Sequence, residues 1–287
     1  MTYKIITDSG CDLPQAMLSQ LDVTVTPLHV LFRGENLVDS VDDTQIKTVY
    51  AGLREGEHTT TSAVNPEGWK ETIAPVLAEG FDALVLTFSS GLSTTYQSAV
   101  IAAQDLQEEY PQRKVVVIDT LCAALGQGLL VWYACQKRAE GLSLDALAAW
   151  VNETKPHLCH WFTVDDLMYL KRGGRVSATT AVVGTLLKIK PVLHVDDHGK
   201  LVSMAKVRGR KSSIDALVCK MEELAGEIDN RMVFISHGDC LEEAQLLRDL
   251  VLEKTGAREV FVGNLGAVIG SHAGPGTLAL FFLGSHR

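Results

Sequence analysis

The sequence lacks an excess of basic residues, a long apolar run and a secretory signal, and each absence excludes a class of protein. Its 26 Lys and Arg against 35 Asp and Glu give a formal charge of −9. This charge argues against a nucleic-acid-binding protein, which usually carries a basic face. No apolar run approaches the roughly 20 residues of a membrane span. The first residues lack the basic and apolar regions of a signal peptide, so we expect a cytoplasmic protein.

Closely spaced cysteines and nucleotide-binding motifs are also missing. The six cysteines are irregularly spaced without a Cys-x-x-Cys pair, which fits reduced thiols better than disulfides or a zinc site. Cys159 and His160 are adjacent, which is poor geometry for two ligands of one metal, so we assign no metal. Neither a GxxxxGK[ST] motif nor a GxGxxG after the first strand is present. We therefore expect no cofactor.

The first half of the chain alternates strand and helix patterns. Strands are predicted at residues 4–7, 23–31, 81–88 and 114–119. The second of these carries Pro27, which is tolerated at a sheet edge or at a strand end. Apolar residues recur at helical spacing in 96–106 and 144–151. Alternation of this kind predicts a Rossmann-like parallel sheet with helices on both faces.

The second half has a different pattern and predicts a second α/β domain. Six strands are predicted at residues 158–164, 191–195, 201–207, 232–236, 260–263 and 277–283, and three helices at 179–187, 213–228 and 241–254. A hairpin at His198-Gly199 makes this six-stranded sheet mixed. We place the boundary near Lys155-Pro156, which gives domains of 1–155 and 156–287.

The most informative segment is the hydroxyl-rich stretch from Ser89 to Ala99, which follows a buried strand and opens a helix. Parallel sheets bind ligands at the carboxyl ends of their strands, and free N–H groups at a helix N-terminus favour anions. One Ser or Thr would suffice as an N-cap. Five hydroxyl residues among positions 89–95, with Gly91 between them, favour a binding loop instead.

Two other loops have similar chemistry. The stretch 59–66 is rich in Thr and precedes a helix; Asn65 suits an N-cap with Pro66 at the first helical position, but capping does not explain the Thr run. The Gly-rich stretch 266–276 carries Ser271 and His272. An isolated His is more often structural, but glycines allow a ligand to approach closely and imidazole can donate hydrogen bonds. We therefore expect a binding role for His272.

Two cationic clusters occur in this acidic chain. The first runs from Leu170 to Val176 and contains Arg172 and Arg175, and the second is Arg208-Gly209-Arg210-Lys211. Both suit a phosphate or an acidic partner, and a solvated turn is an equal alternative for the first.

Taken in order, these motifs resemble the DegV family, which includes the fatty-acid-binding subunits of bacterial fatty acid kinases. The matching motifs are Thr7-Asp8-Ser9, Asp12-Leu13-Pro14, Thr61-Ser62 with Pro66, Ser90-Gly91-Leu92-Ser93, Thr95-Tyr96-Gln97-Ser98-Ala99, Asp119-Thr120, residues 170–175, Ile189-Lys190-Pro191, residues 208–211 and residues 266–276. The resemblance spans nearly the whole chain. Thr94 stands where the family often has Gly, and Thr120 stands where it often has Ser. Thr94 adds a Cβ near the expected head group, where its side chain would either add a hydrogen-bond donor or shift the carboxylate slightly.

The resemblance implies a long-chain fatty acid buried in a tunnel between the two domains. Its carboxylate would be held by the hydroxyl loops and by the His of the last motif. Those residues are Thr61, Ser62, Ser93, Thr94 and His272. The resemblance also implies that a separate dihydroxyacetone-kinase-like subunit phosphorylates the bound acid to an acyl phosphate that feeds phospholipid synthesis.

Further consequences of the resemblance concern the surface of the chain. Arg172, Arg175 and Arg208 match positions linked with kinase docking or phosphoryl transfer. The protein itself would be non-catalytic, monomeric and in only transient contact with membranes.

Two alternatives belong to other classes. An esterase or thioesterase would use Ser93 and His272, and needs them within hydrogen-bond reach together with an acidic orienting residue. The stretch 91–95 departs from the G-x-S-x-G pattern of such enzymes at its last position. A regulatory nucleic-acid-binding protein is disfavoured by the charge of −9.

Overall fold

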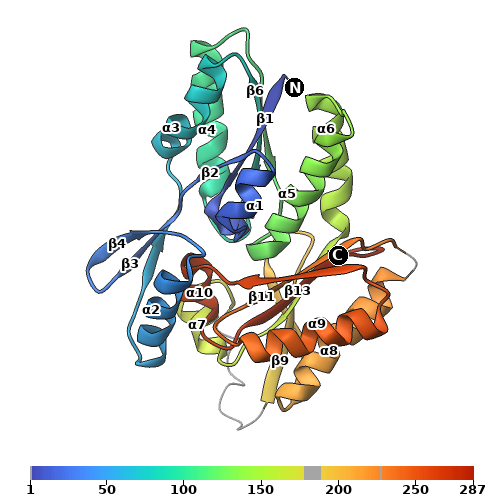
Figure 1. The fold of residues 1–287 in the computed structure, drawn as a ribbon. Coiled ribbons are helices and arrows are strands. Elements are labelled where there is room, and N and C mark those ends of the chain that lie inside the picture. The colour runs from blue at the N-terminus through green and yellow to red at the C-terminus, as the bar shows by residue number, and fades with distance from the viewer. Residues whose placement is uncertain (1, 178–188, 227) are drawn as a thin grey trace.

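A computed structural model describes residues 2–177, 189–226 and 228–287 of the chain. Its elements form two main layers, one built around a parallel sheet and the other around a larger mixed sheet (Figure 1). The first layer and its extension contain β1 (Tyr3–Asp8), α1 (Gln15–Gln20), β2 (Val23–Thr26), β3 (His29–Phe32), β4 (Glu35–Val38), α2 (Asp43–Arg54), β5 (Thr60–Ser62), α3 (Pro66–Ala78), β6 (Asp82–Thr87), α4 (Thr95–Glu109), β7 (Val115–Asp119), α5 (Ala124–Ala139) and α6 (Leu144–Thr154). The second contains β8 (Leu158–Thr163), α7 (Leu167–Arg172), β9 (Ile189–Val195), β10 (Leu201–Arg208), α8 (Arg210–Ala225), β11 (Met232–His237), α9 (Leu241–Lys254), β12 (Glu259–Asn264), α10 (Ala267–Ala273) and β13 (Leu278–Leu283).

The parallel sheet has the order β2-β1-β6-β7 and is covered on both faces. Successive side chains of a strand point to opposite faces, and β1 shows this directly. Ile5 packs with residues of α5 and α6, whereas Ile6 packs with residues of α3 and α4. Burial on both sides explains why these strands read as continuous apolar runs. The predicted Rossmann-like layer is confirmed.

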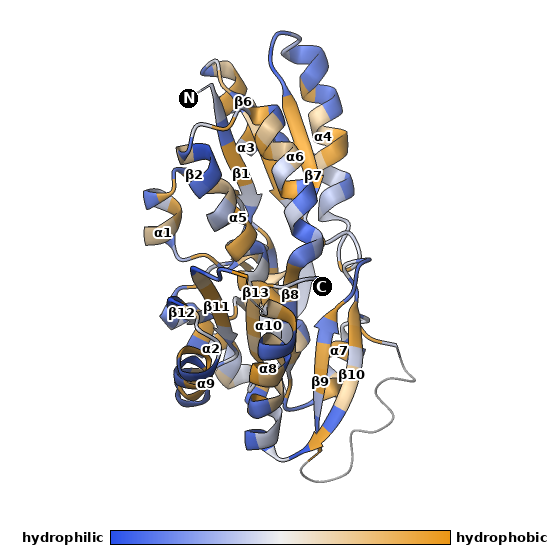
Figure 2. Cartoon of the chain, turned by 90° about the vertical axis from the view of Figure 1, so that its right-hand side faces the viewer, coloured by the Kyte–Doolittle hydropathy of each residue, from blue (hydrophilic) through white to orange (hydrophobic). Residues whose placement is uncertain are grey.

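The second sheet has the order β10-β9-β8-β13-β11-β12 and is mixed, because β11 and β12 are parallel while the other pairs are antiparallel. The hairpin predicted at His198-Gly199 joins β9 to β10. Helices α8 and α9 cover one face of the sheet. The strands of both sheets are mainly hydrophobic, whereas α9 is largely hydrophilic on its outer side (Figure 2). The predicted mixed six-stranded sheet is confirmed.

Three predictions of local structure are wrong. Residues 23–31 are two strands of different sheets, because Pro27 has no N–H to continue the ladder; β2 pairs with β1, and β3 pairs with β4 and β5. The Thr-rich stretch 59–66, predicted as a loop, contains strand β5, which pairs with β3. The Gly-rich stretch 266–276 contains helix α10 rather than a continuous loop. The predicted helix at 179–187 lies outside the described residues.

The extension formed by β3, β4, α2 and β5 lies against the second layer rather than beside its own sheet. Helix α10 contacts α2, β3 and β5, and Figure 1 shows these elements side by side. Helix α5, from the first half of the chain, packs on β8, β11 and β13 of the second sheet. The two halves thus interlock, and the proposed boundary between residues 155 and 156 stays a prediction. In the described parts of the chain, no helix is long and apolar enough to cross a membrane.

Gly126 of α5 lies where the two layers pack closely, against His160 and Phe281 of the second sheet. A Cβ at this position would lie 2.2 Å from His160 Nε2 and 2.7 Å from Phe281 Cδ1. We expect Gly126→Ala to lower the free energy of unfolding by about 1–3 kcal/mol, because overpacking forces buried side chains from their rotamers. Urea denaturation measures this change.

Gly68→Ala in α3 is the matched control, because its Cβ would meet Asn65 and Val64 at an ordinary distance of 3.4 Å. Replacing this helical Gly should leave the protein equally stable or stabilise it by about 0.5–1 kcal/mol. Equal stabilities of the two variants would show that the ring of His160 can move aside without cost.

Candidate functional site

An internal cavity of about 560 Å³ lies between the layers. Its wall is mainly apolar and comes from loops after the parallel strands, the start of α5, strands β8 and β13, and helix α10. The lining residues include Leu28, Phe88, Ala123, Ala124, His160, Phe162, Leu170, Val195, Leu201, Leu265, Val268, Ile269, Ala273, Ala279 and Phe281. Such a cavity suits a ligand with a long apolar part.

One region of the cavity wall is polar, and all five predicted carboxylate-binding residues lie there. They are Thr61, Ser62, Ser93, Thr94 and His272, joined by Arg175. Strand β5 supplies the first two, the loop before α4 the next two, and the last turn of α10 supplies His272. The structure thus brings together residues from positions 61 to 272 of the chain. Their role in binding stays a prediction.

Hydrogen bonds fix the tautomer of His272. Its Nε2 lies 2.7 Å from Thr61 Oγ1, and its Nδ1 lies 3.5 Å from Arg175 Nη1. A guanidinium can only donate, so Nδ1 accepts and the imidazole proton is on Nε2. Nε2 therefore donates to Thr61 Oγ1. The hydroxyl hydrogen of Thr61 is then free to point toward a ligand in the cavity.

The imidazole of His272 is uncharged at neutral pH. Burial, and secondarily the charge of Arg175, lowers the pKa of His272 from 6.5 to about 4. Gly173 makes room for the ring, because a Cβ there would lie 2.3 Å from Nδ1. His272 can therefore hold a carboxylate only by hydrogen bonding in this state, and the positive charge nearby is that of Arg175.

Arg175 is half-buried and has no acidic partner among the described residues. Its guanidinium donates to the carbonyls of Leu92 and Gly173 as well as facing His272. Burial lowers the pKa of Arg175 from its ordinary value, which reflects the cost of moving its charge out of water. A half-buried cation without a carboxylate partner is typical of a site for an anionic ligand.

The hydroxyl groups in the loop before α4 have two roles. Some make capping contacts at the start of α4, and others line the cavity. Ser93 Oγ lies 2.9 Å from Thr95 Oγ1 and accepts from Thr95 N at 3.2 Å, so it also serves the start of α4. Thr94 is the N-cap residue but makes no side-chain capping bond. Thr94 and Ser62 are exposed and line the cavity, so this polar end reaches the protein surface.

The hydroxyl loop is held by the β9–β10 hairpin of the second sheet. The sequence predicted the hairpin but not this contact. Ser89 Oγ donates to Gly199 O at 2.8 Å. A Cβ at Gly91 would lie 2.6 Å from His198 O and 2.7 Å from Gly199 O, so only glycine fits. The glycine in this loop therefore serves the contact between the layers.

Arg172 does not line the main cavity. It lines a neighbouring pocket of about 240 Å³ that shares Thr61, Arg175 and His272 with the cavity. Its guanidinium lies 4.6 Å from the ring centre of Tyr169, and the described residues contain no carboxylate paired with it.

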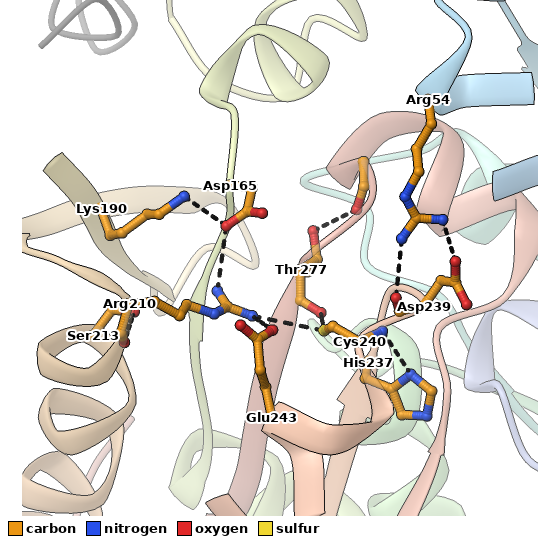
Figure 3. A network of polar contacts seen from close by, with 11 residues as sticks. Arg54, Asp165, Lys190, Arg210, Ser213, His237, Asp239, Cys240, Glu243 and Thr277 are labelled. Atoms are coloured by element: carbon orange, nitrogen blue, oxygen red, sulfur yellow. Dashed lines mark hydrogen bonds and ion pairs between the residues drawn. The ribbon is translucent and has the colours of Figure 1, made fainter. Parts of the chain in front are cut away.

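The two arginines of the second cationic cluster, residues 208–211, have different surroundings in the structure. Arg210 pairs with Glu243 at 2.8 Å and approaches Asp165 at 3.7 Å, and Lys190 also pairs with Asp165 (Figure 3). Arg208 ends β10 and is exposed, away from both cavities. Arg208 is thus available to a partner, whereas the charge of Arg210 is compensated internally.

Sequence reasoning missed the apolar wall of the cavity. His160, Phe162, Ala279 and Phe281 share one face of β8 and β13 and line it. Their strand pattern indicated burial but not which buried face contains a cavity. Both ring nitrogens of His160 are engaged, with Leu158 O and Ala123 N.

Two α/β layers around an internal cavity, apolar along its wall and polar at one end, define a ligand-binding protein. A model of the DegV family, described as "Uncharacterised protein, DegV family", matches residues 2–285. A DegV domain-containing protein of Clostridium perfringens is 43% identical over 286 residues, covering 99% of this chain and 98% of that protein. The chain belongs to the DegV family, as its motifs indicated.

Solved structures agree with this assignment. A DegV family protein from Thermus thermophilus, described by its fatty acid binding, has a TM-score of 0.89 and 34% identity, covering 99% of this chain and 100% of that one. A stearic-acid-binding protein from Eubacterium ventriosum has a TM-score of 0.89 and 26% identity, covering 98% of both chains. Both of these structural neighbours are described as binding fatty acids.

Proposed function

We propose that this protein carries a long-chain fatty acid and presents its carboxylate to a separate kinase subunit. The observation that carries the proposal is the mainly apolar cavity whose polar end combines neutral hydrogen-bond donors with the cation of Arg175, which has no acidic partner in the described parts of the chain. Fatty acid binding by related DegV structures supports it. Thr61, Ser62, Ser93, Thr94 and His272 would hold the carboxylate.

The energetics fit a tight but reversible carrier. Burial of about 14 methylenes at about 0.8 kcal/mol each contributes about 11 kcal/mol as an upper figure. Loss of ligand freedom offsets several kcal/mol of this. A carboxylate leaving water needs hydrogen bonds, which the hydroxyls and imidazole supply.

The kinase step needs a partner that brings a nucleoside triphosphate and its metal. A carboxylate oxygen would attack the terminal phosphorus, and the new O–P bond would form as the bond to the leaving nucleoside diphosphate breaks. The diphosphate takes the electron pair, and the product is an acyl phosphate for phospholipid synthesis. Such transfer depends on positioning and charge neutralisation. Arg172 in the neighbouring pocket, Arg175 and the exposed Arg208 are the cations that we assign to docking or to the phosphate.

The esterase alternative fits the geometry less well. A Ser-His pair needs a hydrogen bond between them and an acidic residue that orients the imidazole. Ser93 Oγ is bonded to Thr95, and His272 Nδ1 faces the guanidinium of Arg175. A cation stands where a triad has its carboxylate, so the imidazole is a poor base.

We further propose that the protein is a cytoplasmic monomer with only transient membrane contact.

Mass spectrometry of protein purified from a bacterial host tests the proposal. Under native conditions we expect an excess mass of a few hundred daltons, released as a free fatty acid on denaturation. This mass also reports the preferred acyl chain. A protein that stays ligand-free after incubation with several fatty acids would refute the carrier function, and turnover of a chromogenic ester would then favour the esterase.

A further inference from the structure

The motifs Thr7-Asp8-Ser9 and Asp12-Leu13-Pro14 have no part in the site described so far. They place two carboxyl groups at the end of β1, and a third, Asp39, follows β4. Asp8, Asp12 and Asp39 are 0%, 2% and 6% exposed, respectively. No Lys, Arg or His of the described residues forms an ion pair with them. Three buried carboxyl groups without a cation are costly when ionised, so they need a structural explanation.

Two of these carboxyl groups, Asp12 and Asp39, lie at the start of helix α10, whereas Asp8 accepts hydrogen bonds from Gly10 N, Phe88 N and Gln127 Nε2. Asp39 Oδ1 accepts from Val268 N at 3.0 Å, and Asp39 Oδ2 accepts from Ser9 Oγ at 2.8 Å. Asp12 Oδ1 lies against the backbone of Gly266, where a Cβ would approach it to 2.4 Å. Gly266 is the N-cap of α10 and has no side chain to make a capping bond. The cap is therefore supplied by residues more than 200 positions earlier in the chain.

Helix α10 connects this carboxyl cluster (Asp8, Asp12 and Asp39) to the ligand cavity. Val268 and Ile269 in its first turn and Ala273 at its end line the cavity, and His272 in its last turn forms the bond to Thr61. Tyr50 braces the helix from the side, with its hydroxyl donating to Leu265 O at 3.1 Å. Any shift of this seven-residue helix moves His272.

Asp12 is the least satisfied member of the cluster. Among the described residues, neither of its oxygens has a well-formed hydrogen-bond partner, although the Gly266 amide lies beside it. No group of three or more His, Cys, Asp or Glu side chains in the described regions is placed to hold a metal ion. A proton on Asp12 would lower the cost of burying these oxygens.

Burial, followed by repulsion from Asp39, raises the pKa of Asp12 well above its ordinary value. Burial also raises the pKa of Asp8 to about 7 and that of Asp39 to about 6. Of the other groups facing the cluster, Cys11 and Tyr50 have pKa values raised by burial and stay neutral. Beyond Tyr50 lie Cys240, whose pKa burial raises to about 12, and the ion pair of Arg54 with Asp239.

We propose that Asp12 and Asp39 are positioning residues for His272, and that protonation of the carboxyl cluster holds α10 in the arrangement that retains the ligand. This inference rests on the proposed fatty acid carrier function. It gives the first motifs of the sequence a role, and it makes ligand retention depend on pH.

The direction of the pH effect follows from proton linkage. Opening around α10 would let water reach the carboxyl groups and return their pKa values toward 3.8, so opening releases protons. Retention is therefore strongest at low pH, weakens as pH rises above 3.8, and levels off once the raised pKa of each carboxyl group is passed. His272 has the opposite effect, because its pKa is lowered from 6.5 to about 4, but this effect ends above pH 6.5. Above that pH only the carboxyl cluster contributes.

The test is the rate of palmitate transfer from the protein to albumin between pH 6.5 and about pH 8.5. For the wild type we expect this rate to rise with pH, by up to about tenfold per pH unit for each carboxyl group that is still protonated in the closed protein. Asp12→Asn mimics the protonated acid, and Asn tolerates the left-handed backbone at this position, where φ is 54°. For this variant we expect a rise of less than about threefold.

Asp22→Asn is the matched control, because Asp22 is also left-handed, with φ of 50°, but is exposed to solvent and paired with Lys4. It should behave as the wild type. Equal pH dependence in the wild type and Asp12→Asn, or no dependence in the wild type, would overturn the inference.

Hydrogen exchange of the α10 amides tests the inference without a ligand. After correction for intrinsic exchange, protection should fall above pH 6.5 in the wild type and persist in Asp12→Asn. Protection that does not change with pH in the wild type would overturn the inference. If palmitate binds at no pH but α10 protection titrates as expected, the carrier function fails while the role of the carboxyl cluster stands.

Discussion

Ser93→Ala combined with His272→Ala should raise the dissociation constant for palmitate about 100-fold or more, because each change removes a hydrogen bond to a buried carboxylate worth about 1.5–3 kcal/mol. Loss of the imidazole also frees Thr61, whose hydroxyl is oriented by the 2.7 Å contact with His272 Nε2. The fold should persist. Ser93 also accepts from Thr95 N, so we expect the free energy of unfolding to fall by only about 1 kcal/mol. Equilibrium binding and urea denaturation measure the two effects.

The matched control is the double variant Ser98→Ala with His198→Ala. It also removes one hydroxyl and one imidazole, but away from the proposed site. Ser98 lies in α4 close to Ser93, His198 is exposed in the β9–β10 turn, and the cavity wall includes neither of them. Its affinity should equal that of the wild type. Unchanged affinity in the Ser93 and His272 variant would remove both residues from the carboxylate site.

Arg287→Ala should lower the free energy of unfolding by about 3–5 kcal/mol, since the side chain is 7% exposed and its loss removes five hydrogen bonds to segments that are distant in the sequence. Its guanidinium donates to the carbonyls of Leu121, Lys155, Leu158 and Asp196 and to Cys122 Sγ. These acceptors belong to the turn before α5, the connection into β8 and the β9–β10 turn. One side chain thus ties together three segments that border the ligand cavity.

The exposed Arg248 provides the matched control, because its ion pair with the neighbouring Asp249 lies in solvent. Arg248→Ala should change stability by less than about 0.5 kcal/mol. Arg287→Lys keeps the charge but has too few donors in the right geometry, so it should recover only part of the loss. If Arg287→Ala unfolds at the same urea concentration as Arg248→Ala, the proposed tie between the segments is wrong.

Much of the fold could be predicted from local patterns. The continuous apolar runs around Leu84 and Val116 indicated strands buried on both faces, and both belong to the parallel sheet. Asn65 was predicted to cap a helix beginning at Pro66, and its side chain accepts from Gly68 N at 2.8 Å. Such signals succeed because the hydrogen bonds and periodicity that produce them span only a few residues.

The errors arose where distant contacts decided the local structure. The apolar run 23–31 has the composition of one strand, but β3 is stabilised by pairing with β4 and β5, away from β2. The stretch 266–276 is rich in glycine and reads as a loop, but Asp39 caps it as helix α10. Gly270 is needed there, because a Cβ would lie 2.3 Å from the Tyr50 hydroxyl.

The sequence by itself determined the two kinds of sheet, the polar loops at strand ends and membership of the DegV family. The tertiary structure alone decided that Thr61 meets His272 across 211 positions, that Arg175 rather than a carboxylate faces that imidazole, and that Arg287 joins three segments. Periodicity reports which side of an element is buried, but not which partner it finds. Contacts between distant residues depend on how the layers pack, and that packing is a property of the whole chain.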